Sequence, residues 1–144
     1  MNDCKIMDKL PTVEEYNWIR AQVGWGIYQE DVIKKALPNS LYGVCAYHDG
    51  KLIGMARVIG DNGLVFYIQD VIILPKYQRQ GIGKQLMDKV MEFIHKNVSH
   101  NTIIGLMSSK GKESFYERYG FTNRPTEKLG SGMTIFWDKN TNRF

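Results

Sequence analysis

A pair of glycines beside basic residues predicts an anion-binding loop. Gly81 and Gly83 follow a predicted buried strand that runs out at Pro75, and they open a predicted amphipathic helix. Glycine lets a ligand approach the backbone without obstruction by a Cβ atom, and the free N–H groups of a first helical turn attract anions. Arg79 and Lys84 add positive charge at the edges of the loop. The pattern therefore indicates a cradle for phosphate groups.

Two common phosphate-binding motifs do not fit this loop. A dinucleotide-binding fingerprint requires a third glycine at the position of Leu86. A Walker loop that ends in Gly83-Lys84 requires glycine at position 78 and serine or threonine at position 85, but the chain has Gln78 and Gln85. A Gly-x-Gly pair at a helix start is by itself more often a tight turn. The surrounding residues must decide between a turn and a binding loop.

Those surrounding residues match a known pattern. The string Gln78-Arg79-Gln80-Gly81-Ile82-Gly83 resembles the Q/R-x-x-G-x-G/A acetyl-CoA signature of the GCN5-related N-acetyltransferase (GNAT) family. A second stretch, FYERYGF at residues 115–121, is similar to the family's second motif. The resemblance extends to the order of elements across nearly the whole chain. The chain departs from the family before the second motif, where Ser108-Ser109-Lys110 stands in place of the usual asparagine.

The resemblance implies an acetyl-CoA site. In the family, loop amides and the helix N-terminus hold the pyrophosphate of the cofactor. Backbone groups of Val71, Ile72 and Ile73 would pair with the pantetheine amides as an extra strand, which requires the two parallel strands to splay apart. Because unpaired buried backbone is costly, we expect the cofactor to stabilise the fold. The matching loop positions are Gln78, Arg79, Gln80, Gly81, Ile82, Gly83 and Lys84.

The same resemblance implies that Tyr116 is the general acid. Its phenol would lie beside the thioester sulfur and protonate the departing CoA thiolate. A phenol with a pKa of about 10 is a plausible donor to a thiolate. By residue type alone Tyr116 would be an ordinary core aromatic, and Tyr119 is the alternative donor on the same predicted helix.

The general base is less clearly marked. Tyr67 and Gln69 occupy the strand positions that carry the base in family members, and neither is a convincing base. Asp70 is the carboxylate nearby, so we predict that Asp70 is the base. Two alternatives stay open: Asp70 is a hydrogen-bonding structural group, or a chain of water molecules carries the proton to bulk solvent.

An aromatic loop between the first two predicted helices is the candidate acceptor site. Trp25 stands between Gly24 and Gly26, and Tyr28 follows. If the family's geometry holds, Trp25 and Tyr28 cover the acceptor pocket, and their large apolar area suits an organic amine. The alternative of equal weight is that the loop plugs the core.

Hydrophobic periodicity and turn signals predict the elements that position these residues. Residues 64–74 are nearly all apolar, which indicates a central strand buried on both faces. The order strand, helix, strand within residues 64–107 predicts a parallel crossover. We expect an α/β (α+β) fold of a single GNAT-like domain, 1–144, with a mixed, mostly antiparallel sheet and flanking helices. Helices are predicted at 12–23, 30–37, 82–98 and 112–119, and strands at 41–47, 52–59, 64–74, 102–107 and 133–137.

The composition of the chain indicates which partners to expect. The net charge of +4 over 144 residues is weak evidence for nucleic acid, so we expect no nucleic-acid partner. No apolar run approaches the roughly 20 residues of a membrane span, and the N-terminus lacks a signal-peptide pattern. Cys4 and Cys45 are not clustered with histidines at ligand spacing, so no metal is expected. These observations predict a cytoplasmic protein.

The functional prediction is an acetyl-CoA-dependent N-acetyltransferase that moves acetyl directly to a primary amine in a ternary complex. A small-molecule amine is the favoured acceptor. The alternatives are a protein N-terminus or lysine, and a non-catalytic acyl-CoA-binding regulatory module. An exposed C-terminal strand could pair between subunits, which makes a homodimer possible.

Overall fold

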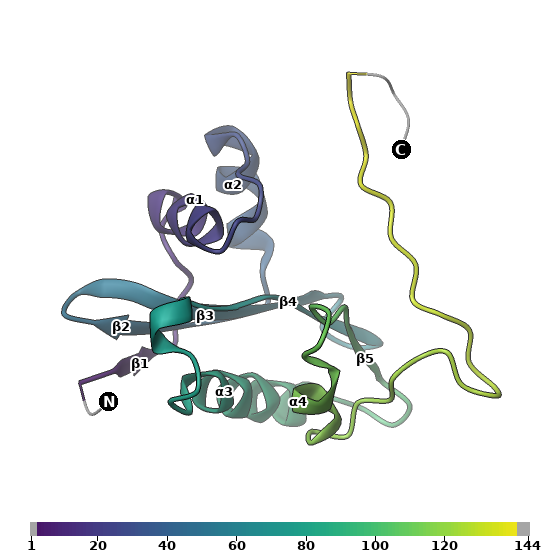
Figure 1. Ribbon diagram of the computed structural model, residues 1–144. Helices are drawn as coiled ribbons and strands as arrows, with labels where there is room; N and C mark the ends of the chain where they lie inside the picture. Colours follow the sequence, from purple (N-terminus) through teal and green to yellow (C-terminus); the bar gives the residue numbers. More distant parts are fainter. Residues whose placement is uncertain (1–2, 141–144) are drawn as a thin grey trace. The chain divides into compact units, whose positions relative to one another are not determined.

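The computed structural model describes residues 3–140 (Figure 1). The chain divides into two compact units, Met1–Leu106 and Met107–Phe144. The assignment of residues 1–144 to one domain stays a prediction.

The first unit contains a five-stranded sheet in the order β1-β2-β3-β4-β5. The first three pairings are antiparallel and the β4–β5 pairing is parallel. The helix α3 connects β4 to β5, so the predicted parallel crossover is confirmed and with it the α/β fold class. Strand β1 was not predicted, because three residues are too few to show periodicity. The strands are β1 (Lys5–Met7), β2 (Tyr42–His48), β3 (Lys51–Gly60), β4 (Val65–Ile73) and β5 (Ile103–Leu106).

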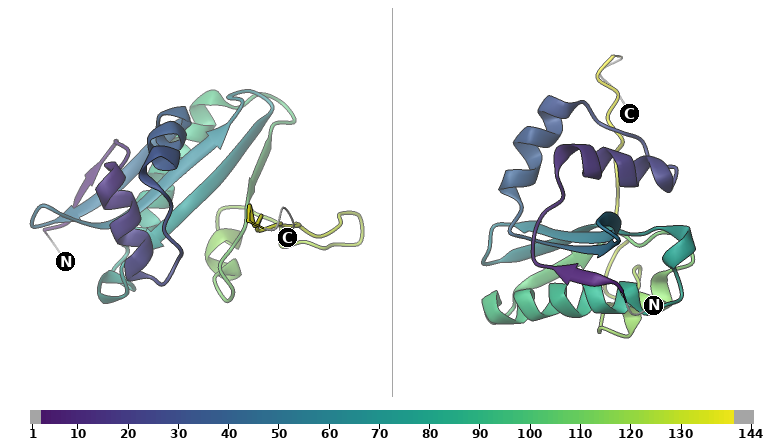
Figure 2. Two further views of the ribbon diagram at one scale, coloured as in Figure 1. Left: turned by 90° about the horizontal axis from the view of Figure 1, so that it is seen from above. Right: turned by 90° about the vertical axis from the view of Figure 1, so that its left-hand side faces the viewer.

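Helices cover both faces of this sheet (Figure 2). Helices α1 (Val13–Gln22) and α2 (Glu30–Ala36) lie on one face, and α3 (Ile82–Asn97) lies on the other. Thr12 begins α1 with a capping box, in which its hydroxyl and the Glu15 carboxylate each accept a backbone N–H. A short 3₁₀ turn, Leu37–Asn39, follows α2. Within residues 3–140, no helix combines the length and the apolar composition needed to cross a membrane.

Strand β4 changes its buried face at a bulge. The register between β3 and β4 shifts opposite Asp70, whose φ is +60°. Phe66 stacks edge-on against Phe93 of α3, whereas Ile72 packs in the cluster with Tyr16 of α1. In a regular strand Phe66 and Ile72 would face the same side, because side chains alternate with a period of two. The prediction that both faces are buried throughout is therefore wrong, since each half of β4 buries a different face.

The second unit contains one helix and a long extended stretch. Helix α4 spans Glu113–Glu117, and Gly120 follows it with a φ of +95°, as expected of a C-terminal cap. The strand predicted at 133–137 is wrong: residues 131–137 form neither helix nor strand. The apolar pattern of this stretch favours a strand, but a strand also needs a hydrogen-bonded neighbour, and none is paired with it in the described part of the chain.

Candidate active site

The loop from β4 to α3 is held in shape by its own glutamines. The Gln78 side-chain amide donates to the carbonyl oxygen of Ile73 at 3.0 Å, and the Gln80 amide donates to that of Lys76 at 3.3 Å. Arg79 has a φ of +64°, which few side chains adopt without support. The two glutamines therefore fix the backbone of the predicted cofactor loop.

The start of α3 is open to a ligand. Gly81 is the N-cap residue in the left-handed region, with φ +82°, and no side chain caps the helix. A Cβ atom added at Gly81 would meet nothing within 4 Å, and the first turn has no acidic residue. N–H groups at a helix start carry partial positive charge, so this site suits an anion. Lys84 forms an ion pair with Asp88 at 2.8 Å on the exposed surface of the same helix.

The parallel pairing of β4 with β5 covers only the first part of β4. The β4–β5 ladder runs from Val65, opposite Ile103, to Ile68, opposite Leu106, and β5 ends there. Strand β4 continues to Ile73 and pairs over this stretch with β3 on its other edge. The predicted splay of the two strands beyond this point stays a prediction. Within the described residues, the backbone of 69–73 has no neighbouring strand on the β5 side.

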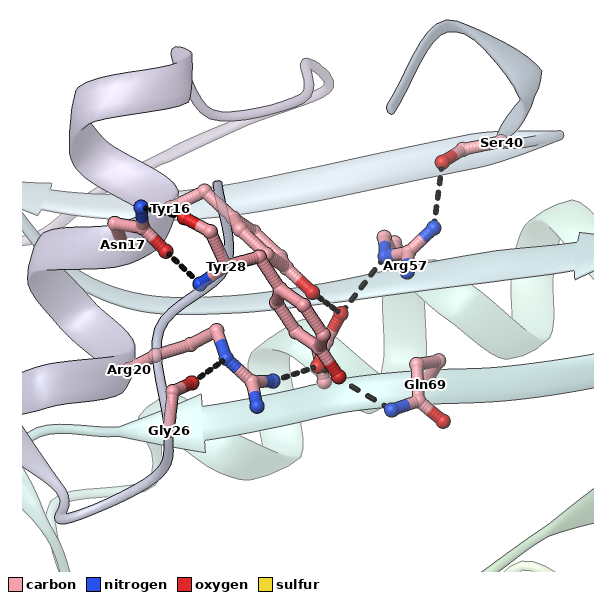
Figure 3. Close-up of polar contacts among 9 residues, drawn as sticks. Tyr16, Asn17, Arg20, Gly26, Tyr28, Ser40, Arg57 and Gln69 are labelled. Carbon is pink, nitrogen blue, oxygen red and sulfur yellow. Dashed lines mark hydrogen bonds and ion pairs between the residues drawn. The ribbon is translucent and has the colours of Figure 1, made fainter. Parts of the chain in front are cut away.

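Tyr16, Arg20 and Arg57 point toward one another in a polar cluster between α1 and the sheet (Figure 3), and the buried Asp70 of β4 accepts hydrogen bonds from all three. One carboxylate oxygen, Oδ2, accepts from the Tyr16 hydroxyl at 2.7 Å and from Arg57 Nε at 2.8 Å. The other, Oδ1, accepts from Arg20 Nη1 at 3.0 Å and from Gln69 Nε2 at 3.3 Å. Burial and the neighbouring carboxylate raise the pKa of Tyr16 to about 12, so this phenol stays a donor at neutral pH.

This arrangement bears on the predicted role of Asp70. Its side chain is 0% exposed, and four donors occupy the lone pairs of its two oxygens. A general base needs a free lone pair directed at the proton that it accepts. The geometry therefore favours the structural alternative, in which Asp70 balances the charge of Arg20 and Arg57 and supports the bulge. The role of Asp70 as base stays a prediction.

The aromatic loop between α1 and α2 is fastened to the same cluster. Arg20 Nε donates to the Gly26 carbonyl oxygen at 2.7 Å. The Asn17 side chain donates to the backbone carbonyl of Tyr28 at 2.7 Å and accepts its N–H at 3.0 Å. The Arg20 guanidinium lies 5.3 Å from the Trp25 ring centroid and 4.8 Å from that of Tyr28. These contacts hold the loop at several points.

The two loop aromatics differ in burial. Trp25 is partly buried and packs against the core cluster that includes Tyr16 and Ile72. Tyr28 is 50% exposed, so one part of its ring is open to solvent while Arg20 lies over it. Of the two predicted acceptor residues, Tyr28 is the one whose ring is accessible. The packing of Trp25 favours the alternative in which the loop fills the core, and its role in the acceptor site stays a prediction.

Tyr116 is the buried residue of α4 in the second unit. It is 9% exposed and its ring lies edge-on to Phe115 at 5.0 Å and to Phe121 at 6.3 Å between centroids. Burial raises its pKa above the ordinary value of 10.0. The FYERYGF motif thus builds an aromatic cluster that keeps the Tyr116 phenol protonated. Tyr119 packs against Phe115 at 5.8 Å.

Comparison with known proteins agrees with this geometry. Residues 21–136 match the acetyltransferase (GNAT) domain family. The chain belongs to the GNAT family. A ycf52-like N-acetyltransferase of Prochlorococcus marinus is 37% identical to this GNAT protein over 130 residues, covering 88% of the chain and 69% of the relative. The histone acetyltransferase TAP1 of Glycine max is 31% identical, covering 83% of the chain and 54% of the relative.

A solved structure of similar sequence has the same fold. A Staphylococcus aureus protein described as a probable acetyltransferase superposes with a TM-score of 0.85 at 34% identity, covering 93% of this chain and 99% of that chain. The chain thus spans about half to two thirds of the two curated relatives and nearly all of this structure.

Sequence reasoning missed three residues of this GNAT site: Tyr16, Arg20 and Arg57. Tyr16 and Arg20 are one helical turn apart, and with Ile19 they form the buried residues of α1. An arginine on an apolar helix face is a signal for a buried anionic partner. Among the described residues, no group of three or more His, Cys, Asp and Glu side chains lies close enough to hold a metal ion.

Proposed function

We propose that this GNAT protein transfers acetyl from acetyl-CoA to the primary amine of a small molecule, with both substrates bound together. The observation that carries the proposal is the uncapped start of α3 at Gly81, close in sequence to the edge of β4 that β5 leaves without a neighbour. Together these features offer donors for a pyrophosphate and an unpaired strand edge for a chain of amides.

The residues present fit acetyl-CoA as a substrate. The N–H groups that follow Gly81 in the first turn of α3 would hold the pyrophosphate, and Gly81 leaves room for it. The backbone of Val71, Ile72 and Ile73 would pair with the pantetheine amides along the open edge. Gln78 stabilises both the loop and the end of β4, because its side-chain amide donates to the carbonyl oxygen of Ile73.

In the proposed reaction the amine nitrogen attacks the thioester carbonyl carbon, and the carbon–sulfur bond breaks. The departing thiolate accepts a hydrogen bond from the Tyr116 hydroxyl and takes up its proton from water. The pKa of this phenol lies above 10.0 because of burial, whereas a thiol has a pKa of about 8.5. Tyr116 therefore stabilises the thiolate mainly by donating a hydrogen bond, and its own ionisation should not limit activity at or below neutral pH.

The amine loses its own proton through water in this proposal. Asp70 acts on the site through its partners: it fixes Arg20, which in turn holds Gly26 and the Tyr28 ring. The exposed face of Tyr28 would contact an apolar or aromatic part of the acceptor.

A polypeptide acceptor is the second candidate, because one relative over 83% of the chain is the histone acetyltransferase TAP1. A protein with no turnover, which only binds acyl-CoA, is the third. The cytoplasmic location also stays a prediction.

Thiol release from acetyl-CoA separates these candidates. We expect turnover with small primary amines that carry an apolar body, and little with lysine-rich peptides. Tyr116→Phe keeps the ring packing and removes the hydroxyl proton, so turnover should fall about a hundredfold while CoA affinity is unchanged. Tyr119→Phe is the matched control on the same motif. Binding of CoA without release for any amine would favour the non-catalytic module, and normal turnover of Tyr116→Phe would move the role to another donor.

A further inference from the structure

The polar cluster around Asp70 carries more positive than negative charge. Arg20 and Arg57 each form an ion pair with Asp70, and among the described residues no second acidic side chain pairs with either guanidinium. Tyr16 stays a neutral donor because its pKa is raised to about 12, and the amide of Gln69 is neutral. The single carboxylate therefore offsets only one guanidinium, and the cluster keeps an excess positive charge.

This excess charge has little contact with water. The side chains of Arg20 and Arg57 are 10% and 12% exposed. The Arg20 guanidinium lies 4.8 Å, 5.3 Å and 5.6 Å from the ring centroids of Tyr28, Trp25 and Tyr16. Aromatic faces attract a cation but carry no net charge. Because a buried charge without a counterion is costly, a ligand that supplies one negative charge would stabilise the cluster.

Arg20 has a donor available for such a ligand. Its Nε donates to the Gly26 carbonyl oxygen and its Nη1 to Asp70, whereas Nη2 has no hydrogen-bond partner among the described residues (Figure 3). This nitrogen is not one of the buried polar atoms that lack a hydrogen bond, so solvent reaches it. The half-exposed ring of Tyr28 lies over the same guanidinium. A ligand here can place a negatively charged oxygen on Nη2 and an apolar part on Tyr28.

We propose that the acceptor amine carries a carboxylate, which binds Arg20 Nη2 and supplies the missing negative charge. This inference rests on the proposed acetyl transfer, since it names the class of acceptor for the same site. Asp70 directly precedes Val71, so a ligand held at Arg20 lies near the edge of β4 where acetyl-CoA is proposed to bind. A carboxylate matches the excess charge, whereas a phosphate monoester carries about 1.5–2 negative charges at neutral pH.

Matched pairs of amines test the inference by thiol release from acetyl-CoA with the wild-type protein. Phenylalanine differs from phenethylamine only by a carboxylate near the nitrogen, and para-aminomethylbenzoate differs from benzylamine only by a carboxylate at the far end of the ring. We expect the carboxylate to raise kcat/KM at least about tenfold in one pair or both, because charge-assisted hydrogen bonds are strong. No preference in either pair, or a larger preference for phosphoethanolamine over ethanolamine, would overturn the proposal.

A variant of Arg20 assigns the preference to this side chain. Arg20→Gln removes one positive charge and leaves Asp70 paired with Arg57, so the preference for the carboxylate should be lost. Lys96→Gln is the matched control, because it removes the same charge from the exposed surface of α3, where Lys96 pairs with Glu92, and it should keep the preference. A preference that survives in Arg20→Gln contradicts the assignment. The comparison of amines on the wild-type protein does not depend on the folding of this variant.

Calorimetry on the CoA-loaded protein separates this inference from the proposed function. Hydrocinnamate has the carboxylate and an apolar body but no amine, and hydrocinnamide is its neutral counterpart. We expect hydrocinnamate to bind at least about tenfold more tightly, and Arg20→Gln to remove the difference. If this difference is found but no amine releases thiol, the proposed transfer fails and the anion site is retained. Thiol release from the amines without this difference retains the transfer and rejects the anion site.

Discussion

Replacing Asp70 with asparagine distinguishes a structural carboxylate from a general base. The substitution keeps the size of the side chain but removes its charge, and it places an N–H₂ group against donors that now bond a carboxylate oxygen. The side chains of Arg20 and Arg57 are 10% and 12% exposed, so both guanidinium groups would be left nearly buried without an anion. Removing one partner of a buried ion pair costs about 3–5 kcal/mol.

This loss should be visible in thermal unfolding. For a chain of this size each kcal/mol lowers the Tm by roughly 3 °C, so we expect Asp70→Asn to lower the Tm by roughly 10–15 °C. Asp88→Asn is the matched control, because Asp88 forms a surface ion pair with Lys84 and its side chain is 49% exposed. Surface pairs contribute about 0–1 kcal/mol, so the control should shift the Tm by at most a few degrees.

Turnover measured below the Tm of the variant completes the test. If Asp70 is structural, the folded Asp70→Asn protein should keep turnover within about tenfold, because the reacting atoms are unchanged. Tyr16→Phe deletes one hydrogen bond to the same carboxylate and should lower stability by about 1.5–3 kcal/mol. Two results together would refute the structural role and identify Asp70 as the base. Asp70→Asn would have to keep its Tm and lose turnover a hundredfold, and Tyr16→Phe would have to keep its turnover.

Two further predictions concern the substrates. Gly81→Glu should weaken CoA binding in calorimetry by well over tenfold, because it places a negative charge where the pyrophosphate is expected; Gly81→Ala carries the same strain at φ +82° without the charge and should retain most of the affinity. Unchanged affinity in Gly81→Glu would show that the anion binds elsewhere. Tyr28→Ala should raise the KM for an amine with an apolar body and leave the KM for acetyl-CoA unchanged, whereas Trp25→Ala should also lower the Tm because Trp25 packs on the core. Equal effects of Tyr28→Ala on both KM values, or no effect, would exclude its ring from the acceptor site.

The sequence by itself determined the features that depend on residues close together in the chain. The Asp49-Gly50 turn has positive φ at both residues, as its dipeptide predicts. The capping box at Thr12 and the glycine-led start of α3 form where their residue types indicate. The parallel crossover follows from the order of elements alone. Each of these features is fixed by hydrogen bonds or backbone angles within a few residues, so the local pattern is sufficient.

Only the tertiary structure decided the surroundings of Asp70 and of the loop aromatics. Asp70 meets Tyr16 and Arg20 across 54 and 50 residues of sequence, and a bulge in β4 turns it toward α1. No local pattern encodes such a contact, because it depends on how α1 packs against the sheet. Residues 133–137 show that a local pattern can also be insufficient. Their apolar side chains predict a strand, but a strand forms only where a second strand supplies the hydrogen bonds, and the segment itself does not specify that partner.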